Sequence, residues 1–205
     1  MQENISPTKE KLLHTAVELM LFKGYNATGV DEICKTAGTT KGSFFHYFPH
    51  KEDLGTAVLD YFWKEMQTIV QQKKFQKISD PLKLLFAYLD SFYDIAKNPS
   101  ISWSCLFGNF AQEIAPNNPI IRKRCEEGFA TWENMLATCI ETAKKHYAPT
   151  TPFNALNLAK YFIATFEGSL LLAKASEDTT IVAENIRQYK QYIELLLTPK
   201  GGGNY

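Results

Sequence analysis

The stretch GTTKGSFFHYFPHKEDL, from Gly38 to Leu54, concentrates side chains that could bind a polyanion. From Thr39 to Lys51 it holds two lysines and two histidines but no acidic residue, and four aromatic rings crowd into the five positions 44–48. Hydroxyls and free backbone N–H groups at a helix N-terminus suit phosphate oxygens, and lysines add positive charge. These residue types favour binding of phosphates and base edges over bond-breaking chemistry. A core helix rich in aromatic residues, with a solvated cationic end, is the alternative interpretation.

Two short helices that cross at a steep angle would present such a face. Thr28 is expected to cap the first, with Asp31 three residues on. This helix should end at Gly38, which can adopt the positive φ of a tight turn, and Cys34 is the small residue that the crossing needs. A second helix should run from about Thr40 to Phe48. The residues expected to face inward are Ile33, Ala37, Phe44, Tyr47 and Phe48, and those expected near an open major groove are Lys41, Ser43, Phe45 and His46.

The remaining chain has helical periodicity throughout, which predicts an all-α protein of about nine helices. Ser6-Pro7 is typical of a helix start, and Pro49 separates the short helices from a long one between about His50 and Gln72. The expected division is a helix-turn-helix domain over 1–60, a helical effector-binding and dimerisation domain over 61–199, and a flexible tail over 200–205.

The composition, net charge and cysteine pattern argue against several classes of protein. Of the 205 residues, 45% are hydrophobic, so a large core is expected, and the formal net charge of zero gives no global field for nucleic acid or membrane. The four cysteines form no C-x-x-C pair, which argues against zinc or a disulfide framework, and no cofactor or metal is expected. Without a signal segment or a long apolar run, the chain is expected to be cytoplasmic and free of membrane.

The segment TGVDEICKTAGTTKGSFFHYFPHKEDL resembles the TetR family of bacterial transcriptional regulators, whose pattern reads roughly T-x-x-x-I-A-x-x-A-G-V-S-K-G-x-L-Y-x-H/Y-F-x-x-K-x-x-L. The resemblance runs from about Lys9 to Leu54 and implies a homodimer that binds double-stranded palindromic operator DNA. Phe45 replaces the usual tyrosine and Thr39 the usual valine. The implied DNA contacts are Thr28, Thr39, Thr40, Lys41, Ser43, Phe45, His46, Tyr47 and Lys51.

The charge of the N-terminal region limits how such contacts could work. Residues 1–54 hold six lysines against seven acidic residues and no arginine, a balance of −1. A bidentate arginine fork to guanine is therefore excluded there. Few phosphate contacts also predict a shallow salt dependence of binding.

Aromatic residues at helical spacing dominate the C-terminal half, a pattern that also fits a plain core. The family resemblance implies that they enclose a pocket for a small-molecule effector, with polar groups such as Asn109, Gln112 and Glu167 to orient it. The expected ligand contacts are Trp103, Phe107, Asn109, Phe110, Trp132, Phe166 and Glu167.

The last two helical segments, after Pro152, are apolar nearly all round and so need partners on two sides. Gly168, Ser169 and Ala173 would permit close helix approach. We therefore expect a four-helix dimer interface.

The segment SWSCLFGNFAQEIA (Ser102–Ala115) resembles a branch of the family with a C-L-x-x-x-x-A-x-E motif, some of whose members sense electrophiles through the cysteine. Cys105 is expected near the start of a helix, where the dipole favours the thiolate. The alternative is that Cys105 is a small buried hydrophobic residue.

The sequence thus predicts a homodimeric repressor released from its operator by a small apolar or aromatic ligand. A repressor triggered through Cys105 and a helical interaction module without specific DNA binding are the alternatives. An enzyme is not expected, because Ser169 in EGSLL lacks the strand–turn–helix context of a nucleophile.

Overall fold

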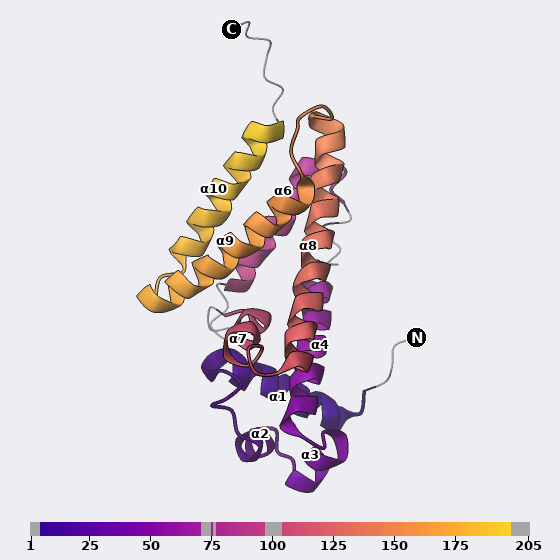
Figure 1. Ribbon diagram of the computed structural model, residues 1–205, viewed down its shortest axis with the longest axis vertical. Helices are drawn as coiled ribbons and strands as arrows, with labels where there is room; N and C mark the ends of the chain where they lie inside the picture. Colours follow the sequence, from indigo (N-terminus) through magenta and orange to yellow (C-terminus); the bar gives the residue numbers. More distant parts are fainter. Residues whose placement is uncertain (1–4, 71–74, 76, 97–103, 198–205) are drawn as a thin grey trace, which may run out of the picture. The chain divides into compact units, whose positions relative to one another are not determined.

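The computed structural model describes residues 5–70, 75, 77–96 and 104–197. Nine α-helices and no strands occur in these ranges (Figure 1). The helices are α1 (Pro7–Lys23), α2 (Val30–Thr36), α3 (Lys41–Tyr47), α4 (Lys51–Val70), α6 (Pro81–Ala96), α7 (Leu106–Glu113), α8 (Pro119–Tyr147), α9 (Ala155–Ser176) and α10 (Thr180–Leu197). The prediction of an all-α chain is confirmed. No helix in the described ranges has both the length and the apolar character needed to cross a membrane.

Helix ends follow local chemistry that the sequence displays. Ser6 caps α1, since its Oγ accepts a hydrogen bond from the Lys9 N–H at 3.3 Å, and Pro7 occupies the first turn. Gly24 ends α1 at φ +87°. Asn154 caps α9 in the same way as Ser6 caps α1, with its Oδ1 accepting from the Asn157 N–H at 2.9 Å.

The chain divides into two compact units, and their bounds differ from the expected domains. The first comprises residues 1–68 and 99–129, and the second comprises 69–98 and 130–205. The expected boundary near residue 60 thus falls inside the first unit, which also includes α7 and the start of α8. The sequence pattern gave no sign of this return of the chain to the first unit.

The first unit is organised around a core to which α1, α2, α3, α4, α7 and the start of α8 all contribute. Its fully buried side chains include Leu12, Met20, Ile33, Phe44, Leu54, Leu59, Phe110 and Ile121. Burial of each such side chain stabilises the fold by roughly 1.5–3 kcal/mol before the entropy cost. The short helices α2 and α3 hold their places because Ile33 and Phe44 enter this core.

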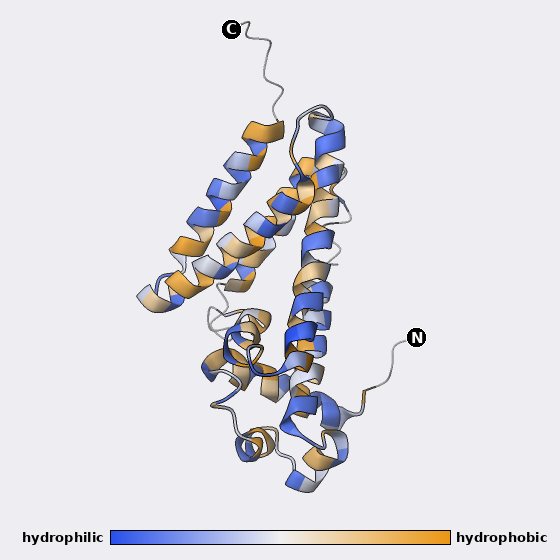
Figure 2. Cartoon of the chain, in the orientation of Figure 1, coloured by the Kyte–Doolittle hydropathy of each residue, from blue (hydrophilic) through white to orange (hydrophobic). Residues whose placement is uncertain are grey.

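In the second unit α10 packs on α9 and on α6 (Figure 1). Buried positions recur every three or four residues along α10, and Figure 2 shows both orange and blue residues down the helix. Two polar contacts tie α10 to α9: the Tyr189 hydroxyl donates to the Leu158 carbonyl at 2.8 Å, and Asn185 Nδ2 donates to Ser169 Oγ at 2.8 Å. Ser169 and Ala173, expected at a dimer interface, are thus buried inside the unit. Of the three small residues, Gly168 has open space where a Cβ would point.

Candidate nucleic-acid interface

The turn between α2 and α3 has the geometry that the glycine predicts. Gly38 adopts φ +64°, in the left-handed region, and the Thr39 N–H donates to the Cys34 carbonyl at 2.9 Å. Ile33 and Cys34 from α2 and Phe44 from α3 are buried against the core. The helix-turn-helix expected from residues 28–48 is therefore present.

The N-terminus of α3 is capped by the Thr40 side chain. Thr40 Oγ1 accepts from the Ser43 N–H at 3.1 Å, and the Thr40 and Ser43 hydroxyls lie 3.0 Å apart. One backbone N–H of the first turn is thus satisfied locally, and an incoming phosphate would compete with the Thr40 hydroxyl for it.

Lys41 begins α3 and forms an exposed ion pair with Asp31 of α2, Nζ to Oδ1 at 2.7 Å. The hydrogen bond that the Lys41 ammonium donates to Asp31, together with the charge of that carboxylate, raises the pKa of Lys41. Exposed ion pairs of this kind contribute little to stability, so a phosphate oxygen can displace Asp31 at little cost.

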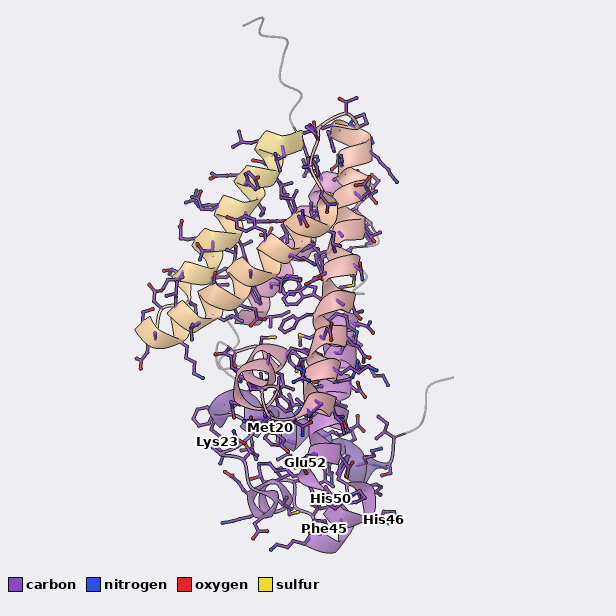
Figure 3. All side chains as sticks on the ribbon, viewed as in Figure 1. Met20, Lys23, Phe45, His46, His50 and Glu52 are labelled. Atoms are coloured by element: carbon purple, nitrogen blue, oxygen red, sulfur yellow. The ribbon has the colours of Figure 1, made fainter. Side chains whose placement is uncertain are left out.

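The outer face of α3 carries the side chains that the sequence assigned to DNA. Phe45 is 50% exposed, although its ring meets the buried Phe44 ring edge-on, and His46 is exposed. Figure 3 labels Phe45, His46 and His50 on this part of the first unit. The face therefore offers an apolar ring, an imidazole, an ammonium and hydroxyls, which are suited to thymine methyls, base acceptors and phosphates.

Thr28, an expected DNA contact, has another partner in the structure. Thr28 is 0% exposed, and its hydroxyl donates to the Gly24 carbonyl at 2.7 Å. It also does not cap α2, whose N-cap is Gly29 without a side-chain bond. The expectation that Thr28 caps α2 is therefore wrong, since its hydroxyl closes the turn after α1, and its contact with a phosphate stays a prediction.

Tyr47 and Thr39 are half-buried rather than open. The Tyr47 hydroxyl accepts a hydrogen bond from Ser6 Oγ at 2.8 Å, a link between α3 and the start of α1. Thr39 Oγ1 is buried and has no hydrogen-bond partner. Its hydroxyl is thus not presented on the surface as the sequence analysis expected.

Lys51, expected to bind a phosphate, is directed back onto the protein. Its Nζ donates to the Tyr25 carbonyl at 2.7 Å and lies 4.1 Å from the centroid of the Tyr25 ring. Burial lowers the pKa of the Lys51 ammonium, and the charges of Glu113 and Glu52 oppose that shift. Neither Tyr25 nor Glu113 could be assigned to this site from sequence, because neither lies near Lys51 in the chain.

The expected effector contacts are divided between the two units. Phe107, Asn109 and Phe110 belong to the first, where Phe110 is fully buried against Tyr25 and Asn109 Nδ2 donates to the Met20 carbonyl at 3.4 Å. Trp132, Phe166 and Glu167 belong to the second. Trp103 lies outside the described residues.

In the second unit Trp132 and Phe166 belong to one aromatic cluster with Tyr88, Phe92 and Phe162. The Phe92 ring lies 5.0 Å from Trp132 and 5.3 Å from Phe166, centroid to centroid. Trp132 Nε1 and the Tyr88 hydroxyl are buried and lack a partner at ordinary hydrogen-bond geometry, although the Trp132 side chain is near enough to lower the Tyr88 pKa slightly. Burial nevertheless raises the pKa of Tyr88 well above its usual range. Such groups are suited to bind a polar atom of a guest molecule.

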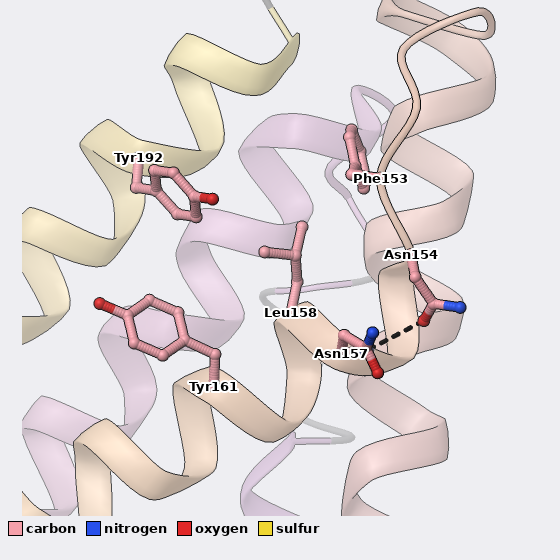
Figure 4. A pocket seen from close by; sticks show the side chains of 6 residues that line it. All are labelled: Phe153, Asn154, Asn157, Leu158, Tyr161 and Tyr192. Carbon is pink, nitrogen blue, oxygen red and sulfur yellow. Dashed lines mark hydrogen bonds between the residues drawn. The ribbon is translucent and has the colours of Figure 1, made fainter.

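A separate groove of about 430 Å³ lies on the same unit, between α9 and α10 (Figure 4). Tyr161 and Tyr192 both line it, and their rings meet edge to face at 6.1 Å, centroid to centroid. None of the expected effector contacts lines this groove. No group of three or more His, Cys, Asp or Glu side chains in the described ranges could hold a metal ion.

Comparison with known proteins gives the family. Residues 12–58 match the family model described as "Bacterial regulatory proteins, tetR family", and residues 81–189 match "Tetracyclin repressor-like, C-terminal domain". The chain belongs to the TetR family and is a DNA-binding transcriptional regulator.

Individual relatives are similar to this chain over more than four fifths of its length. An uncharacterised helix-turn-helix regulator, YxaF of Bacillus subtilis, is 29% identical over 87% of this chain and 93% of its own. The transcriptional repressor NemR of Escherichia coli is 27% identical over 82% of this chain and 85% of its own. A crystal structure of a TetR regulatory protein from Rhodobacter sphaeroides superposes with a TM-score of 0.82 at 25% identity, covering 91% of this chain and 99% of its own.

Proposed function

We propose that this regulator is a homodimeric repressor that holds a palindromic operator through the exposed face of α3 and releases it when a small apolar or aromatic ligand binds. The observation that supports operator binding best is the geometry of α3. Phe44 fixes the helix in the core, while Lys41, Phe45 and His46 on the same short helix remain exposed. A rigid helix with one open polar face is what direct reading of a major groove requires.

An apolar surface on the second unit supports dimerisation. Leu171 and Leu172 of α9 are 61% and 56% exposed, and Leu195 of α10 is 75% exposed. Tyr161, Gly168 and Leu172 follow at spacings of seven and four, which places them on one face of α9. Large apolar side chains gathered on two neighbouring helices are typical of a protein–protein interface. A second copy of the same surface would cover them with twofold symmetry.

The aromatic cluster of the second unit supports a ligand of mixed character. Phe92, Phe162 and Phe166 supply apolar surface, and Trp132 Nε1–H and the Tyr88 hydroxyl supply buried polar groups. A flat apolar molecule with one hydrogen-bond acceptor would use both. Trp132→Phe should then weaken induction and leave operator affinity unchanged.

Selection of bound duplexes from a random pool tests the proposal. The expected product is a palindrome whose half-sites lie about one helical turn, roughly 34–36 Å, apart, bound by two copies of the chain. Recovery of sequences without twofold symmetry would contradict the homodimeric repressor.

A trigger through Cys105 is the second candidate. Cys105 is the N-cap of α7 and is half-buried, whereas Cys34 and Cys125 are buried. Its position at a helix start favours the thiolate. N-ethylmaleimide should dissociate the wild-type complex with DNA but not that of Cys105→Ser. An equal response of the two proteins would leave the reversible ligand as the trigger.

A further inference from the structure

One peptide group in the first unit is held from both sides by opposite charges. The carbonyl oxygen of Tyr25 accepts a hydrogen bond from Lys51 Nζ at 2.7 Å. The N–H of the next residue, Asn26, donates to Glu113 Oε2 at 3.1 Å. These two atoms belong to the same amide, whose oxygen and hydrogen point in opposite directions because the bond is trans. An ammonium, a peptide and a carboxylate thus form a line from α4 to α7.

Helix α7 is fitted closely to this turn. The Glu113 carboxylate lies directly over Gly24, where any Cβ would overlap it. Asn109 Nδ2 donates to the Met20 carbonyl at 3.4 Å, and the Phe110 ring meets the Tyr25 ring at 5.3 Å. Contacts of Asn109, Phe110 and Glu113 therefore fix the position of the Glu113 carboxylate on α7.

The two charged hydrogen bonds reinforce each other. A carboxylate on the N–H polarises the amide and makes its oxygen a better acceptor for the ammonium. The Lys51 side chain is also half-buried against the Tyr25 ring, with Nζ 4.1 Å from the ring centroid. An ammonium that turned to a DNA phosphate would have to leave both the carbonyl and the ring.

We infer that Glu113 and an operator phosphate compete for the Lys51 ammonium through the Tyr25–Asn26 peptide, so that the position of α7 sets how readily Lys51 joins the DNA contacts. The inference rests on the proposed function, since it requires operator binding near the start of α4. It places a residue outside the matched region 12–58 in the DNA-binding apparatus. Because coupling is reciprocal, DNA that draws Lys51 away also loosens Glu113 on the turn.

Operator affinity measured over a range of salt concentrations tests the competition. Glu113→Gln should bind the selected operator about fivefold more tightly, within the usual range of coupling between two sites. Its slope of log affinity against log salt should be steeper by about 0.9, the contribution of one additional phosphate contact. Glu126→Gln removes the same charge from an exposed position of α8 and should change neither quantity.

A second variant isolates the role of Lys51. Lys51→Met keeps the apolar stem on the Tyr25 ring and removes the ammonium. In that background Glu113→Gln should no longer tighten binding or change the slope. A gain that persists without Lys51, an equal gain in Glu126→Gln, or weaker binding by Glu113→Gln would each overturn the inference.

Hydrogen exchange without DNA separates this inference from the proposed function. Lys51→Met and Glu113→Gln should each accelerate exchange of the Asn26 amide relative to wild type. If the Asn26 amide exchanges at the same rate in Lys51→Met as in wild type, the link between Lys51 and Glu113 through the peptide is refuted. A wild-type chain that binds no duplex would contradict the proposed function itself, and the exchange rates would still decide whether the link exists.

Discussion

Ser6 Oγ and the Tyr47 hydroxyl are 2.8 Å apart, a hydrogen bond that joins the cap of α1 to the last turn of α3. The same Ser6 oxygen accepts from the Lys9 N–H. The orientation of α3 thus depends on a serine near the start of the chain as well as on the core beneath Phe44.

Tyr47→Phe should lower the free energy of unfolding by about 0.5–1.5 kcal/mol, the usual net contribution of one hydrogen bond. Ser6→Ala should cost about 1 kcal/mol more, because it also removes the cap of α1. Urea denaturation of the three proteins measures both differences. Tyr47→Phe with wild-type stability would mean that the Ser6 contact contributes nothing.

Gly24→Ala should destabilise the protein more than Gly38→Ala. Gly38 at φ +64° has open space beside it, so alanine there costs only the left-handed strain of about 1–2 kcal/mol. Gly24 at φ +87° and ψ 168° is in a region that L-residues avoid, and its Cβ would also overlap Glu113. In a Glu113→Ala background the cost of Gly24→Ala should fall, and an unchanged cost would show that the carboxylate does not press on this glycine.

Gly168→Ala and Gly128→Ala should have opposite effects on the free energy of unfolding. A Cβ at Gly168 meets nothing within 4 Å, so alanine there should stabilise the isolated chain by roughly 0.5–1 kcal/mol. A Cβ at Gly128 would run into the buried Phe107 ring, and the overpacking should cost about 1–3 kcal/mol. If Gly168 lies in the dimer interface as proposed, its alanine variant should also dissociate more readily in sedimentation. Unaltered dimer affinity would remove Gly168 from the interface.

Leu171→Glu should give monomers, because it places a charge on the apolar surface shared by α9 and α10. Leu195→Glu is the better second variant, since Leu195 is 75% exposed while the neighbouring Leu196 is half-buried. Sedimentation velocity reports the oligomeric state, and the thermal melt reports folding. Two well-folded dimeric variants would place the interface elsewhere.

Cys105 should react with iodoacetamide before Cys125 does. Burial raises the pKa of Cys125 to about 11, so its thiolate is scarce at neutral pH. Between about pH 9 and pH 11 the Cys125 thiol stays protonated in the folded state but ionises in the unfolded state. Its contribution to stability is therefore complete below about pH 9 and is lost as pH rises towards 11. Peptide mapping by mass spectrometry after timed alkylation would reveal the order, and Cys125 reacting as fast as Cys105 at pH 7 would be inconsistent with it.

The sequence predicted what depends on local pattern. The spacing of Cys34, Gly38 and Phe44 defines the helix-turn-helix at fixed offsets, and prolines with capping residues mark most helix starts. These signals are complete within a few residues, so no tertiary information is needed to read them.

The contacts that the sequence missed are those between distant segments. Glu113 and Asn26 are 87 residues apart, and Ser6 and Tyr47 are 41 apart. A hydroxyl or carboxylate can satisfy many partners, and only the fold selects one. Thr28 shows the limit most clearly, because a threonine before a helix suggests a cap, yet its hydroxyl bonds back to Gly24.

Operator binding by Lys41→Ala, compared with Lys64→Ala, tests the central claim most directly. Both variants lose one exposed lysine from the first unit, but only Lys41 lies on α3. With the selected duplex in fluorescence anisotropy, Lys41→Ala should lose roughly 1–3 kcal/mol of binding free energy, while Lys64→Ala binds as wild type and both melt normally. Equal affinity of the two variants for the operator would contradict recognition through α3.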